Sequence, residues 1–201
     1  PPGRRPLDDP GDPVEQVLGM PAESLATEFD LPPLSADGFH GVREEACILA
    51  ESLAETGVRA VTVTDPGYPS GLAIRLGRLA PPVLFFRGGS TLVSGPMLGF
   101  AGARDCSETG SELAREMSAV LAGEGIAVVS GYAPGIDTAA HFGAVRAGGS
   151  TVAVLASGIL HFAPRADLAS FCDDHNTLIV SECFPTLPWR SHSAMQRNKT
   201  I

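Results

Sequence analysis

Residues 130–141, SGYAPGIDTAAH, join a predicted strand to a predicted helix. The strand, at 126–129, is a short apolar run, and the helix continues through 136–147. Gly131 and Gly135 tolerate backbone angles that other residues resist, and they leave room beside the backbone for a ligand. Because the first N–H groups of a helix lack intrahelical partners and carry partial positive charge, this junction predicts a phosphate site.

From residue 97 onward, short apolar segments alternate with amphipathic ones. Strands are predicted at 97–101, 126–129, 151–155 and 178–180, and helices at 108–122, 136–147 and 165–173. Short buried strands between amphipathic helices are typical of a parallel sheet that is covered on both faces. We therefore expect an α/β fold with a doubly wound, mostly parallel Rossmann-like sheet, that is, an extended Rossmann fold.

The chain divides into three predicted parts. Residues 1–38, rich in proline and acidic residues, predict an irregular or helical N-terminal segment. Residues 39–96 predict an extension of the Rossmann-like domain, with helices at 41–56 and 72–79 and strands at 59–64 and 83–86, and residues 97–201 predict its core. The pattern leaves open whether 40–95 continues the same sheet or packs separately. The absence of an initiating methionine and the polar, basic ending indicate a fragment whose core is truncated at its C-terminus.

The charge distribution restricts the function classes. The formal net charge is −9, with −6 in residues 1–98 and −3 in residues 99–201. Neither half is basic, which argues against a broad nucleic-acid-binding surface. Residues 190–201 nevertheless contain Arg190, Arg197 and Lys199 and no acidic residue, so a local basic patch is expected there.

Other patterns exclude further classes. No apolar run reaches membrane-spanning length and no signal peptide opens the chain, so we expect a cytoplasmic protein without membrane contact. The four cysteines lack metal-ligand spacing and predict reduced thiols. No stretch matches GxGxxG or GxxxxGK[ST], so neither a dinucleotide nor a magnesium-bound triphosphate is indicated. We expect no metal and no cofactor.

Ligands of such sheets bind at the carboxyl ends of the strands, and the first segment that falls there is 102–110, GARDCSETG. Arg104 is suited to a phosphate because its guanidinium donates two parallel hydrogen bonds. Ser107 is suited either to phosphate or to capping the helix, and Thr109 with Glu112 matches a capping box.

Three further segments are expected at the same edge. In the second, 130–141, Asp137 and His141 share a helix face, and we favour a helix-start role for Asp137 and sheet packing for His141 over acid–base chemistry. The third, 156–164, contains Gly158 and His161. The fourth begins at Ser181-Glu182 and continues as a long loop, in which Trp189 either stacks on a ligand, beside Arg190 and His192, or packs the loop down.

Together these segments resemble the DNA-processing protein A family, DprA or Smf. The resemblance covers about residues 55–201. It is carried, in chain order, by Asp65 with Tyr68-Pro69, PPVLFFRG at 81–88, Gly102-Ala103-Arg104 with Ser107 and Gly110, SGYAPGIDTAAH at 130–141, GGSTVAVL at 148–155, Ser181-Glu182, and Arg197-Asn198-Lys199. The shared order and spacing of these stretches, rather than any single one, carry the assignment.

The resemblance implies a protein that binds single-stranded DNA, loads a RecA-type recombinase onto it and forms a homodimer, usually in natural transformation. It implies no catalytic residue and no enzyme activity. By position, it implies these DNA- or phosphate-binding residues: Gly102, Arg104, Ser107, Ser130, Gly131, Gly135, Asp137, Arg197, Asn198 and Lys199. The chain departs from the family pattern at Pro134, where a basic residue is common, and at Ala194 and Met195, where many members have Phe-Pro.

Two alternatives stay open at this point. One is a nucleotide-binding sensor or a nucleoside-monophosphate-cleaving enzyme of a related Rossmann family, for which Glu182 is the only acid that we can propose as a base. The other is a structural or regulatory domain of a larger protein.

Overall fold

The computed structural model of the chain describes residues 46, 48–165, 173 and 175–201. The predicted N-terminal segment 1–38, the first part of the helix predicted at 41–56 and most of the helix predicted at 165–173 lie outside the described residues. The strands are β1 Val58–Thr62, β2 Val83–Gly88, β3 Met97–Gly99, β4 Ala127–Ser130, β5 Thr151–Leu155 and β6 Thr177–Ser181. The helices are α4 Ser70–Leu76, α5 Glu108–Gly123, α6 Ile136–Arg146 and α7 Ser191–Arg197, and residues 48–55 are also helical.

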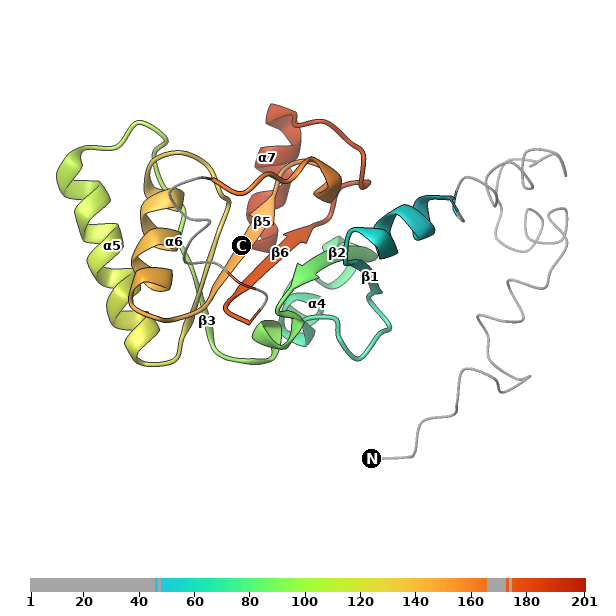
Figure 1. Ribbon diagram of the computed structural model, residues 1–201, viewed down its shortest axis with the longest axis horizontal. Coiled ribbons are helices and arrows are strands. Elements are labelled where there is room, and N and C mark those ends of the chain that lie inside the picture. The colour runs from blue at the N-terminus through green and yellow to red at the C-terminus, as the bar shows by residue number, and fades with distance from the viewer. Residues whose placement is uncertain (1–45, 47, 166–172, 174) are drawn as a thin grey trace, which may run out of the picture. The chain divides into compact units, whose positions relative to one another are not determined.

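The described strands form a six-stranded sheet in the order β1-β2-β6-β5-β4-β3. Strands β3, β4, β5 and β6 run parallel, whereas β2 pairs antiparallel with both β6 and β1. The mostly parallel Rossmann-like sheet is therefore confirmed (Figure 1). Within residues 58–88, β1 and β2 extend the same sheet at one edge.

Alternating side chains place a core on each face of the sheet. On β4, Val128 packs against Phe100 and Ala140, on the face that α6 covers. Its neighbour Val129 points the other way and packs with Val152 and with Leu72 of α4. Helices α5 and α6 pack side by side (Figure 1). Helices therefore cover both faces, as the buried strands required.

One element was predicted wrongly, since helix α7 lies within the stretch that we expected to be a long loop. Its first turn has no side-chain cap, and Arg190 stands at the N-cap position. Among its residues only Ser193, Ala194 and Arg197 are buried, so the sequence shows little apolar periodicity. The predicted strand 97–101 is also shorter than expected, because β3 ends at Gly99.

Candidate functional site

The loops that follow β3, β4, β5 and β6 meet around a hollow of about 510 Å³. Its walls include Arg104 after β3, Tyr132 after β4, Ser157 and Phe162 after β5, Trp189 after β6, and Arg197 of α7. This is the carboxyl edge of the parallel strands, where the sequence predicted a site. Arg104 and Arg197 thus face one hollow although they are far apart in the sequence.

Arg197 is a buried cation in the wall of this hollow. It is 5 % exposed, and its guanidinium donates a hydrogen bond to the carbonyl of Val154 in β5. Burial lowers the pKa of Arg197, and the charge of Asp137 opposes that shift. A Cβ atom at Gly131 would overlap the guanidinium, so the absence of a side chain at this turn makes room for Arg197 in its observed position.

Gly135 brings the loop after β3 onto the start of α6. Its φ is 82°, and a Cβ atom there would overlap the carbonyl oxygen of Ala103. The first amide of α6, on Ile136, donates to that same carbonyl at 3.2 Å, and the Thr138 amide donates to Ala133 at 3.2 Å. These amides, which the sequence suggested for phosphate, are therefore used within the protein.

Three other predicted residues also have internal partners. The hydroxyl of Ser130 donates to the Phe100 carbonyl at 2.8 Å, and Ser130 is fully buried. The Asp137 carboxylate accepts a hydrogen bond from the Ala133 amide at 3.3 Å. Gly102 lies against the side chain of Ile136, which a Cβ atom would meet. These three residues hold the turn around the hollow in place.

Ser107 is the N-cap residue of α5. Its hydroxyl accepts a hydrogen bond from the Gly110 amide at 3.1 Å, and its backbone is extended. The capping box expected for Thr109 and Glu112 is wrong, because the helix already begins at Glu108 and Glu112 bonds Arg115 at 2.8 Å instead.

Arg104 and Trp189 contact each other at the rim of the hollow. The guanidinium carbon of Arg104 lies 5.4 Å from the centroid of the Trp189 ring, a cation–π contact. Trp189 is 53 % exposed, and Arg104 is also exposed. Arg190 and His192, which we expected beside Trp189, are not among the residues that line the hollow.

An aromatic wall was missed by sequence reasoning. The rings of Tyr132 and Phe162 lie 5.3 Å apart between centroids, and both residues line the hollow. Among the described residues other than glycine, Tyr132 alone has a positive φ, 61°. Its hydroxyl accepts a hydrogen bond from the Arg165 amide at 2.8 Å. The sequence signal for this wall was Tyr132 itself, an aromatic residue between the two glycines of the turn. Strained backbone conformations such as its positive φ cluster at functional sites.

His141 packs on the sheet, as we expected. It is 1 % exposed, and its Nδ1 lies 2.6 Å from the hydroxyl oxygen of Thr151. Because that hydroxyl donates to the Val128 carbonyl, its oxygen accepts a hydrogen bond from Nδ1–H of a neutral imidazole. Burial, and secondarily the charge of Arg197, lowers the pKa of His141 to about 3.

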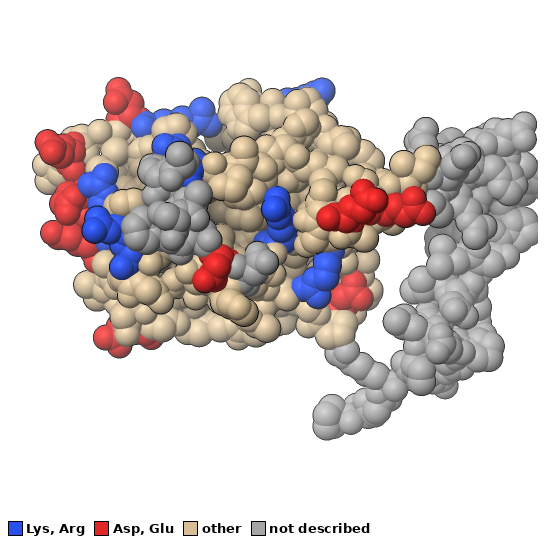
Figure 2. All heavy atoms as spheres, viewed as in Figure 1, with Lys and Arg blue, Asp and Glu red and all other residues tan. Residues whose placement is uncertain are grey.

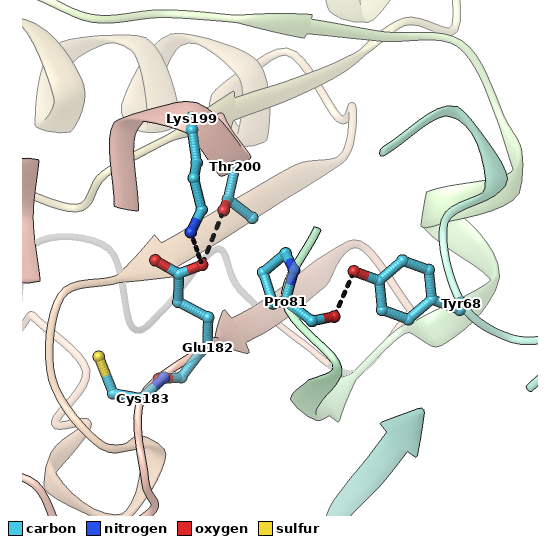
Figure 3. A network of polar contacts seen from close by, with 7 residues as sticks. Tyr68, Pro81, Glu182, Cys183, Lys199 and Thr200 are labelled. Carbon is cyan, nitrogen blue, oxygen red and sulfur yellow. Dashed lines mark hydrogen bonds and ion pairs between the residues drawn. The ribbon is translucent and has the colours of Figure 1, made fainter. Parts of the chain in front are cut away.

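The tripeptide Arg197-Asn198-Lys199 does not act as one cluster. Lys199 Nζ lies 3.2 Å from Glu182 Oε2, and the Thr200 hydroxyl donates to the same oxygen at 3.2 Å (Figure 3). Lys199 lines a second hollow, of about 430 Å³, and neither it nor Glu182 lines the first. Asn198 is exposed in the short turn after α7. Glu182 is therefore placed as a structural partner of Lys199 and not as a base in the first hollow.

None of the described residues that line the hollow is acidic. Figure 2 shows acidic atoms grouped over the region where Figure 1 places α5. That helix exposes Glu108, Glu112 and Glu116. Within residues 46, 48–165, 173 and 175–201, no group of three or more His, Cys, Asp or Glu side chains could hold a metal ion. In the same ranges no helix is long and apolar enough to cross a bilayer.

Comparisons with known proteins point to one family. The family model described as DNA recombination-mediator protein A matches residues 59–201. The DNA processing protein DprA of Bacillus subtilis is 31 % identical over 150 residues, which are 73 % of this chain and 50 % of that protein. The DNA processing protein DprA of Streptococcus pneumoniae is 38 % identical over 109 residues, 53 % of this chain and 38 % of the relative. The chain thus spans about half the length, or less, of these curated relatives.

Solved structures show the same fold. The X-ray structure of DprA from Streptococcus pneumoniae matches with a TM-score of 0.65 and 26 % identity, over 92 % of this chain and 67 % of that one. A structure of DNA processing protein A from Helicobacter pylori, described for its unique single-stranded DNA binding mode, matches with a TM-score of 0.58 and 18 % identity. That match covers 72 % of this chain and 64 % of the other, and it supports the fold alone.

Proposed function

The chain belongs to the DNA recombination-mediator protein A family, and we propose that it binds single-stranded DNA through the hollow at the carboxyl edge of its sheet. The Helicobacter pylori protein is described as binding single-stranded DNA, and the relatives are named for DNA processing rather than for a chemical reaction. The observation that carries the proposal is the meeting of four strand-end loops around Arg104 and Arg197. A guanidinium suits a phosphate because its donors match the anion's geometry.

We assign different roles to the two arginines. Arg104 is exposed at the rim, where its guanidinium lies over the Trp189 ring and is accessible to a phosphate of the strand. Arg197 is fixed by the Val154 carbonyl and sets a positive potential in the wall. Asn198 is an exposed secondary contact, and the phosphate role of Lys199 is weakened by its ion pair with Glu182.

The test is salt-dependent binding of labelled oligothymidine, measured by fluorescence anisotropy. Affinity is measured at about 50 mM and about 200 mM salt for the wild type and for Arg104→Ala. Arg104→Ala is expected to weaken binding about ten-fold and to reduce the salt slope by about 0.7, the value for one phosphate contact on a single strand.

Arg59→Ala is the matched control, because it removes the same charge from β1, at the opposite edge of the sheet from β3. It should leave affinity and slope within error of the wild type. Absence of binding at the lower salt concentration would refute the proposal, and equal losses in both variants would remove Arg104 from the site.

The family description extends the proposal to the whole protein. We propose that the protein, as a homodimer, passes bound DNA to a RecA-type recombinase. The expected result is faster recombinase assembly on DNA that is covered by single-strand-binding protein, and loss of this stimulation in Arg104→Ala. Unchanged assembly rates in the presence of the wild-type protein would contradict this role while leaving DNA binding intact.

A further inference from the structure

Trp189 is about half exposed, in a loop that other contacts hold in place. Its loop is already held by backbone and imidazole contacts to the loop after β5. Gly158 N donates to Leu187 O at 2.7 Å, and Leu160 N donates to Pro185 O at 3.1 Å. His161 Nε2 donates to the Thr186 carbonyl at 2.8 Å. These contacts hold the loop in place without the indole. Packing of the loop therefore does not explain why the apolar Trp189 ring is present with about half of its surface in solvent.

The surroundings of the indole fit a nucleobase. The Arg104 guanidinium lies over the Trp189 ring, so a phosphate bound by Arg104 would bring its nucleotide next to the ring. On the inner side, Tyr132 and Phe162 give the hollow an apolar, aromatic wall. A base has flat apolar faces, and stacking on an exposed aromatic ring removes both surfaces from water.

We propose that Trp189 stacks on an unpaired base of the bound strand and thereby makes the site select single-stranded over duplex DNA. This inference rests on the proposed function, because it names how the same hollow holds its DNA. Bases in a duplex are paired and stacked on each other, so their faces do not reach a protein ring without unstacking. Phosphate contacts alone carry no such selectivity, since both forms of DNA offer phosphates.

The experiment uses the chain's single tryptophan as its own reporter. Three ligands of equal length, about 16 nucleotides, are titrated: oligothymidine, an abasic strand with the same phosphates, and a duplex. Oligothymidine is expected to quench the indole emission and to bind about ten-fold more tightly than the abasic strand. Neither the abasic strand nor the duplex should quench it.

Two variants separate stacking from structure. Both variants lack the chain's only tryptophan, so their binding is followed by the fluorescence anisotropy of labelled strands. In Trp189→Ala, oligothymidine and the abasic strand should bind equally, whereas Trp189→Phe should keep part of the difference. Met195→Ala is the matched control, because Met195 is an apolar side chain on α7, 74 % exposed, that does not line the hollow. It should behave like the wild type.

The outcomes distinguish this inference from the proposed function. Tight oligothymidine binding without quenching, or an unchanged preference over the abasic strand in Trp189→Ala, would overturn the stacking role and leave DNA binding in place. Absence of binding to every ligand at about 50 mM salt would overturn both.

Discussion

Lowering the pH tests the buried state of His141 directly. The side chain is 1 % exposed, and burial, with a smaller effect of Arg197, lowers its pKa to about 3. In the unfolded chain the pKa of an imidazole is about 6.5. Between these two values the unfolded state binds a proton that the folded state excludes, so stability must fall as the pH falls below about 6.5.

The linkage relation gives the size of the effect. Between about pH 7.5 and about pH 5.5, a histidine with these two pKa values removes about 1.4 kcal/mol from the free energy of unfolding. With a urea m-value of about 2 kcal/mol per M, the unfolding midpoint falls by about 0.7 M. His141→Gln keeps an amide donor for the Thr151 hydroxyl but does not titrate, so its midpoint should lack this part of the pH dependence.

The assay is urea unfolding of both proteins, followed by circular dichroism at the two pH values. The other histidines and the carboxylates contribute equally to both proteins, so they cancel in the comparison of the two pH-induced shifts. A general loss of stability in His141→Gln does not matter, because only the shift is compared. Equal shifts in the wild type and in His141→Gln would refute the reasoning, since they would mean that His141 titrates normally in the folded protein.

Further substitutions test other parts of the site, all by urea unfolding. Gly131→Ala should cost about 3 kcal/mol, because its Cβ displaces the Arg197 guanidinium from its buried carbonyl partner; a loss below about 1 kcal/mol would contradict that packing. Lys199→Met should cost about 1–3 kcal/mol by leaving Glu182, 9 % exposed, without its cation, and Glu182→Gln in the same chain should recover part of the loss. Ser107→Ala should cost about 1 kcal/mol and Ser107→Gly only a few tenths, since glycine is tolerated at an N-cap; equal costs would argue against the cap.

Periodicity predicted most of the sheet because each strand carries a strong local signal. The apolar runs at 126–129 and 151–155 became β4 and β5 within a residue at each end. The same signal does not show whether the strand predicted at 83–86 runs parallel or antiparallel to its neighbours, because a buried apolar run has the same pattern in both cases. The antiparallel pairing of β2 with β6 is fixed by long-range contacts that one sequence does not display.

The position of the hollow was predictable, but the contacts made by its residues were not. Parallel strands must end at one edge, so four loops could be assigned to it from the sequence. The glycine at 131 was interpreted as room for a ligand, whereas the space is filled by Arg197, which reaches across from α7. That helix was itself missed, so its burial of Arg197 against Gly131 and Val154 could not be foreseen.

The two arginines explain how an acidic chain is compatible with a DNA site. No acidic residue is among the described residues that line the hollow, and the effect of the exposed acids of α5 on a ligand there is partly screened by salt. Arg197 is buried and donates to the Val154 carbonyl, so Arg104 is the arginine that is exposed to a ligand among the described lining residues. One phosphate contact gives a shallow slope of log affinity against log salt concentration, about −0.7. Affinity must then come largely from bases, so the proposed DNA function and the stacking role of Trp189 support each other. A steep salt slope, together with an abasic strand that binds as tightly as oligothymidine, would show that phosphate contacts and not base stacking supply the affinity.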